Sequence, residues 1–201
     1  MHLLIRCFGF ALAAFIFVNA PSALACACCT ATGWRYVEVE TLKPQRSAEI
    51  EQMRFAGEAK LMIGESDIAI KGIAEPTEDY KLTVSRQKDL LVFSLRDAKD
   101  RAGTLTLVTP KTISIFEVDP RGAEKDKGLG PSLYKEWKLT ANAAGDGLFR
   151  AVTGAGQKMT LVLHGRGNNC SSVDNFTDWT LMVYGPAGKF TLYGALASAA
   201  P

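Results

Sequence analysis

An alternation of apolar and polar residues in short runs, which begins at Trp34, constrains the fold of this chain more than any other feature. In one such run, Ala59 and Leu61 fall on one face of an extended segment, and Glu58 and Lys60 fall on the other. A repeat of two residues is typical of a half-buried strand, because a helix would place its apolar residues three or four positions apart. About a dozen runs of this kind follow one another, separated by turn-forming residues.

The pattern predicts an all-β protein: an antiparallel β-sandwich or a barrel-like single domain of about a dozen short strands. At most one short helix is expected, near residues 47–53, where Ser47 is placed to cap it. No linker-like tract rich in Gly, Ser or Pro interrupts the chain, so residues 34–201 are interpreted as one all-β domain. Closure of the strands into two smaller barrels is the alternative.

Residues 1–25 have the pattern of a signal peptide that is removed on export. The apolar stretch Leu3–Val18 is followed by helix-breaking residues and by Ala23–Ala25, with small residues at the two positions that a signal peptidase recognises. Cleavage there leaves a Cys-rich N-terminal segment, residues 26–33, and predicts a periplasmic or extracellular location. The longest uncharged run in the rest of the chain is residues 190–201, which is too short for a transmembrane segment.

Four cysteines remain after cleavage: Cys26, Cys28 and Cys29 at the new N-terminus, and Cys170. In an oxidising compartment an even count favours disulfides, and four cysteines allow three connectivities. We expect Cys170 to pair with one of the N-terminal three, because a bond between the neighbours Cys28 and Cys29 would be strained. Two alternatives stay open. The C-x-C-C cluster suits copper or zinc, and a lipid anchor on Cys26 would make the protein a membrane-anchored lipoprotein.

Histidine is so scarce that it limits the chemistry of the chain. His2 leaves with the signal peptide, so His164 is the only imidazole of the exported protein, and metal sites that need two or three histidines from one chain are excluded. Neither a nucleophile elbow, nor a zinc-protease pair, nor a phosphate-binding glycine loop is present. The formal net charge of +2 is spread along the chain, so nucleic acid is not an expected partner.

The most distinctive polar segment runs from residue 164 to residue 178, and a polar segment of this length is often functional. Its candidate ligand-binding residues are His164, Arg166, Asn168, Asn169, Asp174 and Asp178. The sequence therefore predicts an exported, non-catalytic ligand-binding or structural module, stapled by disulfides, with a small ligand or a protein as its partner and no cofactor. One alternative is an envelope protein that binds copper or zinc through the C-x-C-C cluster. The other is a hydrolase that uses His164 with the carboxylate of Asp174 or Asp178.

Overall fold

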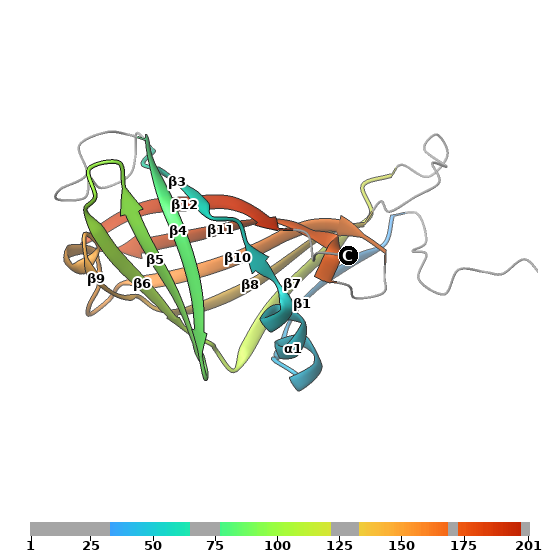
Figure 1. Ribbon diagram of the computed structural model, residues 1–201. Coiled ribbons are helices and arrows are strands. Elements are labelled where there is room, and N and C mark those ends of the chain that lie inside the picture. The colour runs from blue at the N-terminus through green and yellow to red at the C-terminus, as the bar shows by residue number, and fades with distance from the viewer. Residues whose placement is uncertain (1–32, 65–76, 122–132, 169–172, 198–201) are drawn as a thin grey trace, which may run out of the picture.

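The computed structural model describes residues 33–64, 77–121, 133–168 and 173–197 (Figure 1). Twelve strands form one mixed-length antiparallel sheet, which confirms the prediction of an all-β fold with about a dozen strands. In chain order the elements are β1 (Arg35–Thr41), α1 (Pro44–Gln52), β2 (Arg54–Phe55), β3 (Glu58–Met62), β4 (Thr77–Gln87), β5 (Leu90–Asp97), β6 (Ala102–Val108), β7 (Thr112–Val118), β8 (Leu133–Asn142), β9 (Ala144–Gly147), η1 (Arg150–Val152), β10 (Lys158–Gly167), η2 (Val173–Asn175), β11 (Phe176–Gly185) and β12 (Gly188–Ala197).

The α-helix found among the described residues, α1, begins three residues before the predicted position. Pro44 occupies its first turn, where the missing N–H of proline costs no hydrogen bond. The prediction that Ser47 caps the helix is wrong, because the cap position is Lys43 and the Ser47 hydroxyl donates to Glu51 Oε1 at 3.3 Å instead. None of the helices in these ranges has the length and apolar character needed to cross a bilayer.

The sheet formed by the described residues curls back on itself without closing. Its strand order is β1-β7-β8-β10-β11-β12-β3-β4-β5-β6-β9, with β2 beside β12. The last strand, β12, therefore pairs with the early strand β3, while β6 and β7 follow each other in the chain but do not pair in the described sheet. In Figure 1 the hairpins β4–β6 cross in front of β8, β10, β11 and β12, which run lengthwise behind them. The curl gives the sheet an inner face and an outer face.

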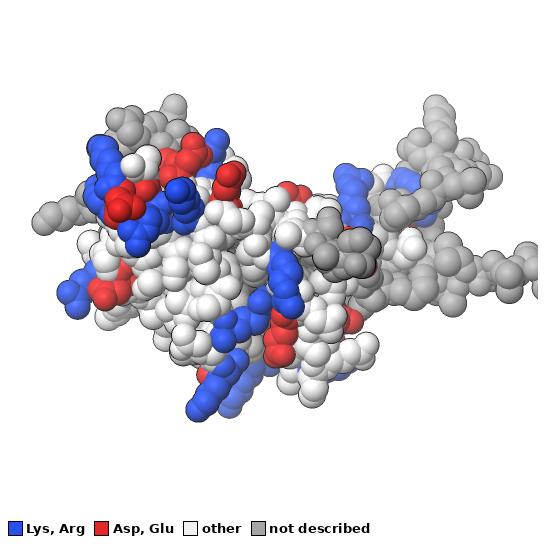
Figure 2. All heavy atoms as spheres, in the orientation of Figure 1, with Lys and Arg blue, Asp and Glu red and all other residues white. Residues whose placement is uncertain are grey.

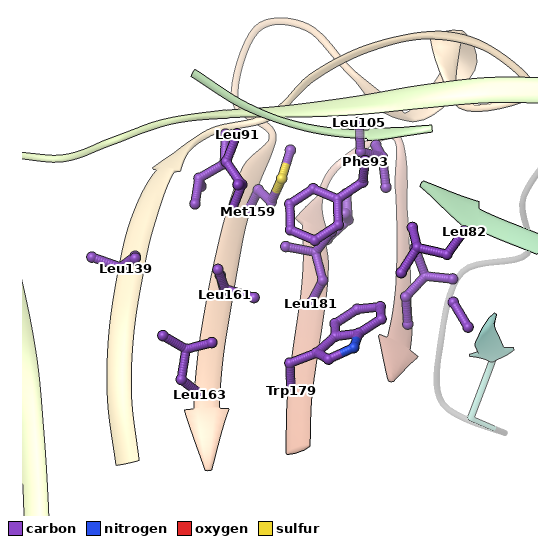
Figure 3. Packing of buried hydrophobic residues seen from close by; sticks show 14 of the residues in the cluster. Leu82, Leu91, Phe93, Leu105, Leu139, Met159, Leu161, Leu163, Trp179 and Leu181 are labelled. Carbon is purple, nitrogen blue, oxygen red and sulfur yellow. The ribbon is translucent and has the colours of Figure 1, made fainter. Parts of the chain in front are cut away.

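The inner face carries the hydrophobic core. Side chains from the lengthwise strands and from the β4–β6 hairpins point toward one another across it (Figure 3). The ring centroids of Phe55, Phe93 and Trp179 lie 5.5 to 5.8 Å apart, in edge-on or tilted arrangements that aromatic pairs prefer. Burial of each such large apolar side chain contributes about 1.5 to 3 kcal/mol to folding. Alternate residues are thus committed to the core, and the residues between them form the outer face.

A bulge in the long strand β10 makes room for the short helix η2. The register between β10 and β11 shifts between His164 and Gly165. A Cβ atom on Gly165 would overlap the backbone oxygen of Asn175, and one on Gly167 would overlap the Asn175 side chain. Both glycines lie on the inner face, so η2 covers the inner face at this end of β10.

Replacing Gly165 by alanine tests this close approach. We expect Gly165→Ala to lower the free energy of unfolding by about 1 to 3 kcal/mol, because backbone atoms of η2 must move to admit the methyl group. Urea or thermal unfolding followed by circular dichroism measures the change. Gly57→Ala is the matched control, since its added Cβ would have its nearest neighbour, the Leu82 carbonyl oxygen, at 4.0 Å. Equal stability of the two variants would contradict the prediction.

Candidate functional site

A connected polar network lies on the outer face of β8, β10 and β11. His164 sits in register with Glu136 on β8 and with Asp178 on β11. Its Nε2 is 2.7 Å from Thr180 Oγ1, and its Nδ1 is 3.8 Å from Glu136 Oε1. Three adjacent strands therefore bring a carboxylate, an imidazole and a hydroxyl together, with Thr180 diagonal to His164 because its cross-strand partner is Val162.

Glu136 is the anionic centre of this network. It accepts hydrogen bonds from the Tyr134 hydroxyl at 2.6 Å and from Lys138 Nζ at 2.7 Å. Partial burial opposes ionisation of Glu136, but these hydrogen bonds outweigh it and lower the pKa of the carboxyl below its usual value. Burial and the bond to Glu136 also raise the pKa of Tyr134 to about 12. Glu136 is thus ionised, and Tyr134 is a hydrogen-bond donor, at neutral pH.

His164 is neutral at pH 7. Burial lowers the pKa of its imidazole below the usual value, although the carboxylates of Glu136 and Asp178 favour the protonated form. A neutral imidazole has one donor and one acceptor nitrogen, so it can exchange a proton with the Thr180 hydroxyl or share one with a ligand.

The network borders a hollow on the same face of the sheet. In the cross-strand register, Thr180 is followed by Tyr193 on β12, Lys60 on β3 and Asp79 on β4. Tyr193 is 37% exposed, and Lys60 Nζ lies 3.4 Å from Asp79 Oδ1. The hollow has a volume of about 640 Å³. We call it the tyrosine hollow, and its polar and aromatic lining includes Glu58, Lys60, Asp79, Tyr80, Lys81, Arg96, Asp97 and Tyr193.

Charges of both signs surround this part of the molecule. Figure 2 shows basic and acidic side chains side by side at the end where β4 begins and β5 ends, whereas the middle of the same view is uncharged. Two exposed pairs at this end are Lys60 with Asp79 and Arg96 with Asp100. Such exposed pairs add little to stability.

The structure divides the predicted ligand-binding residues between two places. His164, Arg166 and Asp178 lie on outer-face positions of β10 and β11. Asn168 follows the end of β10 and is half-buried, and Asp174 belongs to η2, which lies against the inner face. Asn169 lies outside the described residues, as do the four cysteines Cys26, Cys28, Cys29 and Cys170.

Sequence reasoning missed the partners that complete the site. These partners come from five other strands and from positions at least 16 residues from His164 in the chain: Glu136, Thr180, Tyr193, Lys60 and Asp79. The alternation Tyr134-x-Glu136-x-Lys138 does show polar side chains on one face of a strand. It does not show which strand lies beside them, because pairing depends on the long-range register.

In the described ranges, no three His, Cys, Asp or Glu side chains lie close enough together to hold a metal ion. The copper or zinc alternative rests on Cys26, Cys28 and Cys29, so it stays a prediction. Comparison with known proteins adds no identity: no family model matches the chain, and no curated protein or solved structure is significantly similar to it.

The electrostatics of His164 can be tested directly. We expect its pKa to lie below 6.5 in the folded protein, and Glu136→Gln to lower it further, because the carboxylate favours the imidazolium. Since the unfolded chain then binds the proton more tightly, the free energy of unfolding should decrease as the pH falls through about 6.5. An NMR titration of the imidazole measures the pKa, with Asp174→Asn as the control. A higher pKa in Glu136→Gln would contradict this account.

Proposed function

We propose that this protein is a non-catalytic binding module that takes a saccharide in the tyrosine hollow. The observation that carries the proposal is the exposed ring of Tyr193, which lines a hollow beside the paired side chains of Lys60 and Asp79. A volume of about 640 Å³ lies in the range of small-ligand sites. Export, predicted from residues 1–25, agrees with a role in binding a ligand outside the cytoplasm.

The chemistry of the lining fits a sugar. A pyranose ring has a face of C–H groups that stacks on an aromatic ring, and its rim of hydroxyl groups both donates and accepts hydrogen bonds. Tyr193 offers the aromatic surface, since tyrosine combines an apolar ring with a polar tip. Lys60 offers donors and Asp79 offers acceptors, and their mutual pairing keeps both close to the ring.

Two tyrosines of equal exposure allow a matched experiment. We expect Tyr193→Ala to weaken saccharide binding at least about tenfold, which corresponds to the loss of one stacking contact. Tyr184→Ala should leave the affinity unchanged, because Tyr184 is also 37% exposed but lies on β11, outside the lining of the tyrosine hollow. A panel of neutral and acidic tetrasaccharides, followed by calorimetry on those that bind, gives the affinities. An equal loss of saccharide affinity in the two variants would contradict the proposal.

A hydrolase is the second candidate, and the distance of 2.7 Å between His164 Nε2 and Thr180 Oγ1 favours it. A hydroxyl beside a neutral imidazole, which in turn lies near a carboxylate, has the order of groups found in nucleophile, base and orienting acid. The carboxylate nearest Nδ1 is that of Glu136, at 3.8 Å. In this reading the Thr180 hydroxyl attacks the ester carbonyl while His164 takes its proton, and the ester C–O bond breaks as His164 returns that proton to the departing alcohol. Water, deprotonated by His164, then cleaves the acyl–Thr180 bond and releases the acid.

The hydrolase candidate makes a specific prediction for Thr180. Incubation with p-nitrophenyl acetate should leave an acetyl group on Thr180, located by mass spectrometry of the digested protein. Thr180→Val and His164→Ala should both lose the adduct, because one removes the nucleophile and the other its base. Thr191→Val, on β12, is the control and should keep it. Undiminished turnover in the first two variants would eliminate this candidate.

A further inference from the structure

A second hollow adjoins the tyrosine hollow on the outer face of β4, β5 and β6. It has a volume of about 590 Å³ and shares two of its lining residues, Lys81 and Arg96, with the first. Hydroxyl residues form much of the rest, and we call it the hydroxyl hollow, lined by Lys81, Thr83, Ser94, Arg96, Thr104 and Asp146 among others. The two shared cations therefore stand at the boundary between the hollows.

Lys81 and Arg96 are directly opposed across β4 and β5. Like charges that face each other across a strand pair are destabilising unless something compensates them. Glu58 is opposite Lys81 on β3, but no hydrogen bond or ion pair of Lys81 is found in the described part of the chain. Arg96 donates from one nitrogen, Nη1, to Asp100, in a pair that is 52% and 85% exposed and so contributes little.

The next row of the same face consists of hydroxyl groups. Thr83, Ser94 and Thr104 are in register on the three neighbouring strands. Their hydroxyls make no hydrogen bonds with other residues of the described ranges. Ala102 lies beside Arg96 in the cation row, and its small side chain leaves the space above the hydroxyls open. Three hydroxyl donors and two cations thus point to one shallow volume.

The far rim of the hydroxyl hollow does not cancel this positive character. The acidic residue in its lining is Asp146, which is opposite Thr104 on β9. Arg150 Nε lies 3.5 Å from Asp146 Oδ1, in a pair as exposed as that of Arg96 with Asp100, so neither pair contributes much. The lining of the hydroxyl hollow still holds two cations against one carboxylate. The lining is therefore suited to an anion with several acceptor oxygens.

We propose that the ligand is a saccharide that carries a tetrahedral oxyanion ester, a phosphate or a sulfate, and that the ester sits in the hydroxyl hollow. This inference rests on the proposed function, because the sugar ring occupies the tyrosine hollow. Lys81 and Arg96 then lie between ring and ester and neutralise the charge of the ester. The bound anion compensates the repulsion between the two opposed cations, which a neutral sugar does not.

Three probes separate the parts of the proposal: N-acetylglucosamine 6-phosphate, N-acetylglucosamine and inorganic phosphate. In NMR titrations of the whole protein, we expect the sugar phosphate to bind at least about tenfold more tightly than the parent sugar. Because Lys81 and Arg96 also line the tyrosine hollow, the measured quantity is the ratio of the two affinities within one variant, and Lys81→Gln/Arg96→Gln should reduce that ratio to about one. A control with the same charge change, Lys111→Gln/Lys158→Gln, should keep the preference, and higher salt should reduce it.

The outcomes distinguish this inference from the proposed function. Equal binding of both sugars, with Tyr193→Ala weakening both, would overturn the ester site and keep the sugar site. Inorganic phosphate that binds as tightly as the sugar phosphate, with no effect of Tyr193→Ala, would overturn both the ester assignment and the proposed function. No binding of the sugar phosphate at millimolar concentration would also overturn the inference.

Discussion

Burial of β10 on both of its faces is the constraint on which the rest of the structure depends. Met159, Leu161 and Leu163 face the core, and Thr160 and Val162 on the other face are also buried. Polar residues flank Val162 in register, Lys138 on β8 and Thr180 on β11, so an apolar strand face is covered by polar neighbours. Polar groups removed from water need hydrogen-bond partners. The hydrogen bonds of the network around His164 meet that requirement, and the same burial lowers the pKa of its imidazole.

The fold class could be predicted because its signal is local. A repeat of two residues is visible within each run, and Ala59 with Leu61 does fall on the inner face of β3. The first residue of α1 was harder to predict. Ser47 and Pro44 are both signals for a helix start, and only one of them can mark it. The order of the strands in the sheet could not be predicted from the sequence. Adjacent strands such as β12 and β3 are joined by pairing of residues more than a hundred positions apart, as Tyr193 with Lys60 shows.

The same physics explains why the candidate site was only partly predicted. The polar segment 164–178 looks like one loop in the sequence, but its first residues complete β10 and its last ones begin β11. Alternation then sends His164 and Asp178 to the outer face, while η2 with Asp174 lies against the inner face. Residues that are neighbours in the sequence therefore lie on opposite faces of the sheet. Strand pairing instead brings Glu136 and Thr180 close to His164. The polar residue types in this segment correctly indicated residues of a polar network. Their closeness along the chain did not indicate which of them lie together in the fold.

The charged groups on the inner face near α1 are buried, which agrees with our proposal of a binding surface on the outer face. Lys135 is fully buried and is the cross-strand partner of Glu117, while the Arg46 guanidinium lies 4.7 Å from the ring centroid of buried Trp137. Burial lowers the pKa of Lys135, and Glu117 and Glu49 counteract this by favouring its charged form. These buried charges have partners within the chain. Removing one partner would leave the other charge buried and unpaired, which lowers the free energy of unfolding by several kcal/mol. They therefore hold α1 against the sheet, whereas the side chains of Lys81, Thr83 and Ser94 on the outer face make no hydrogen bonds within the part of the chain that the structure describes.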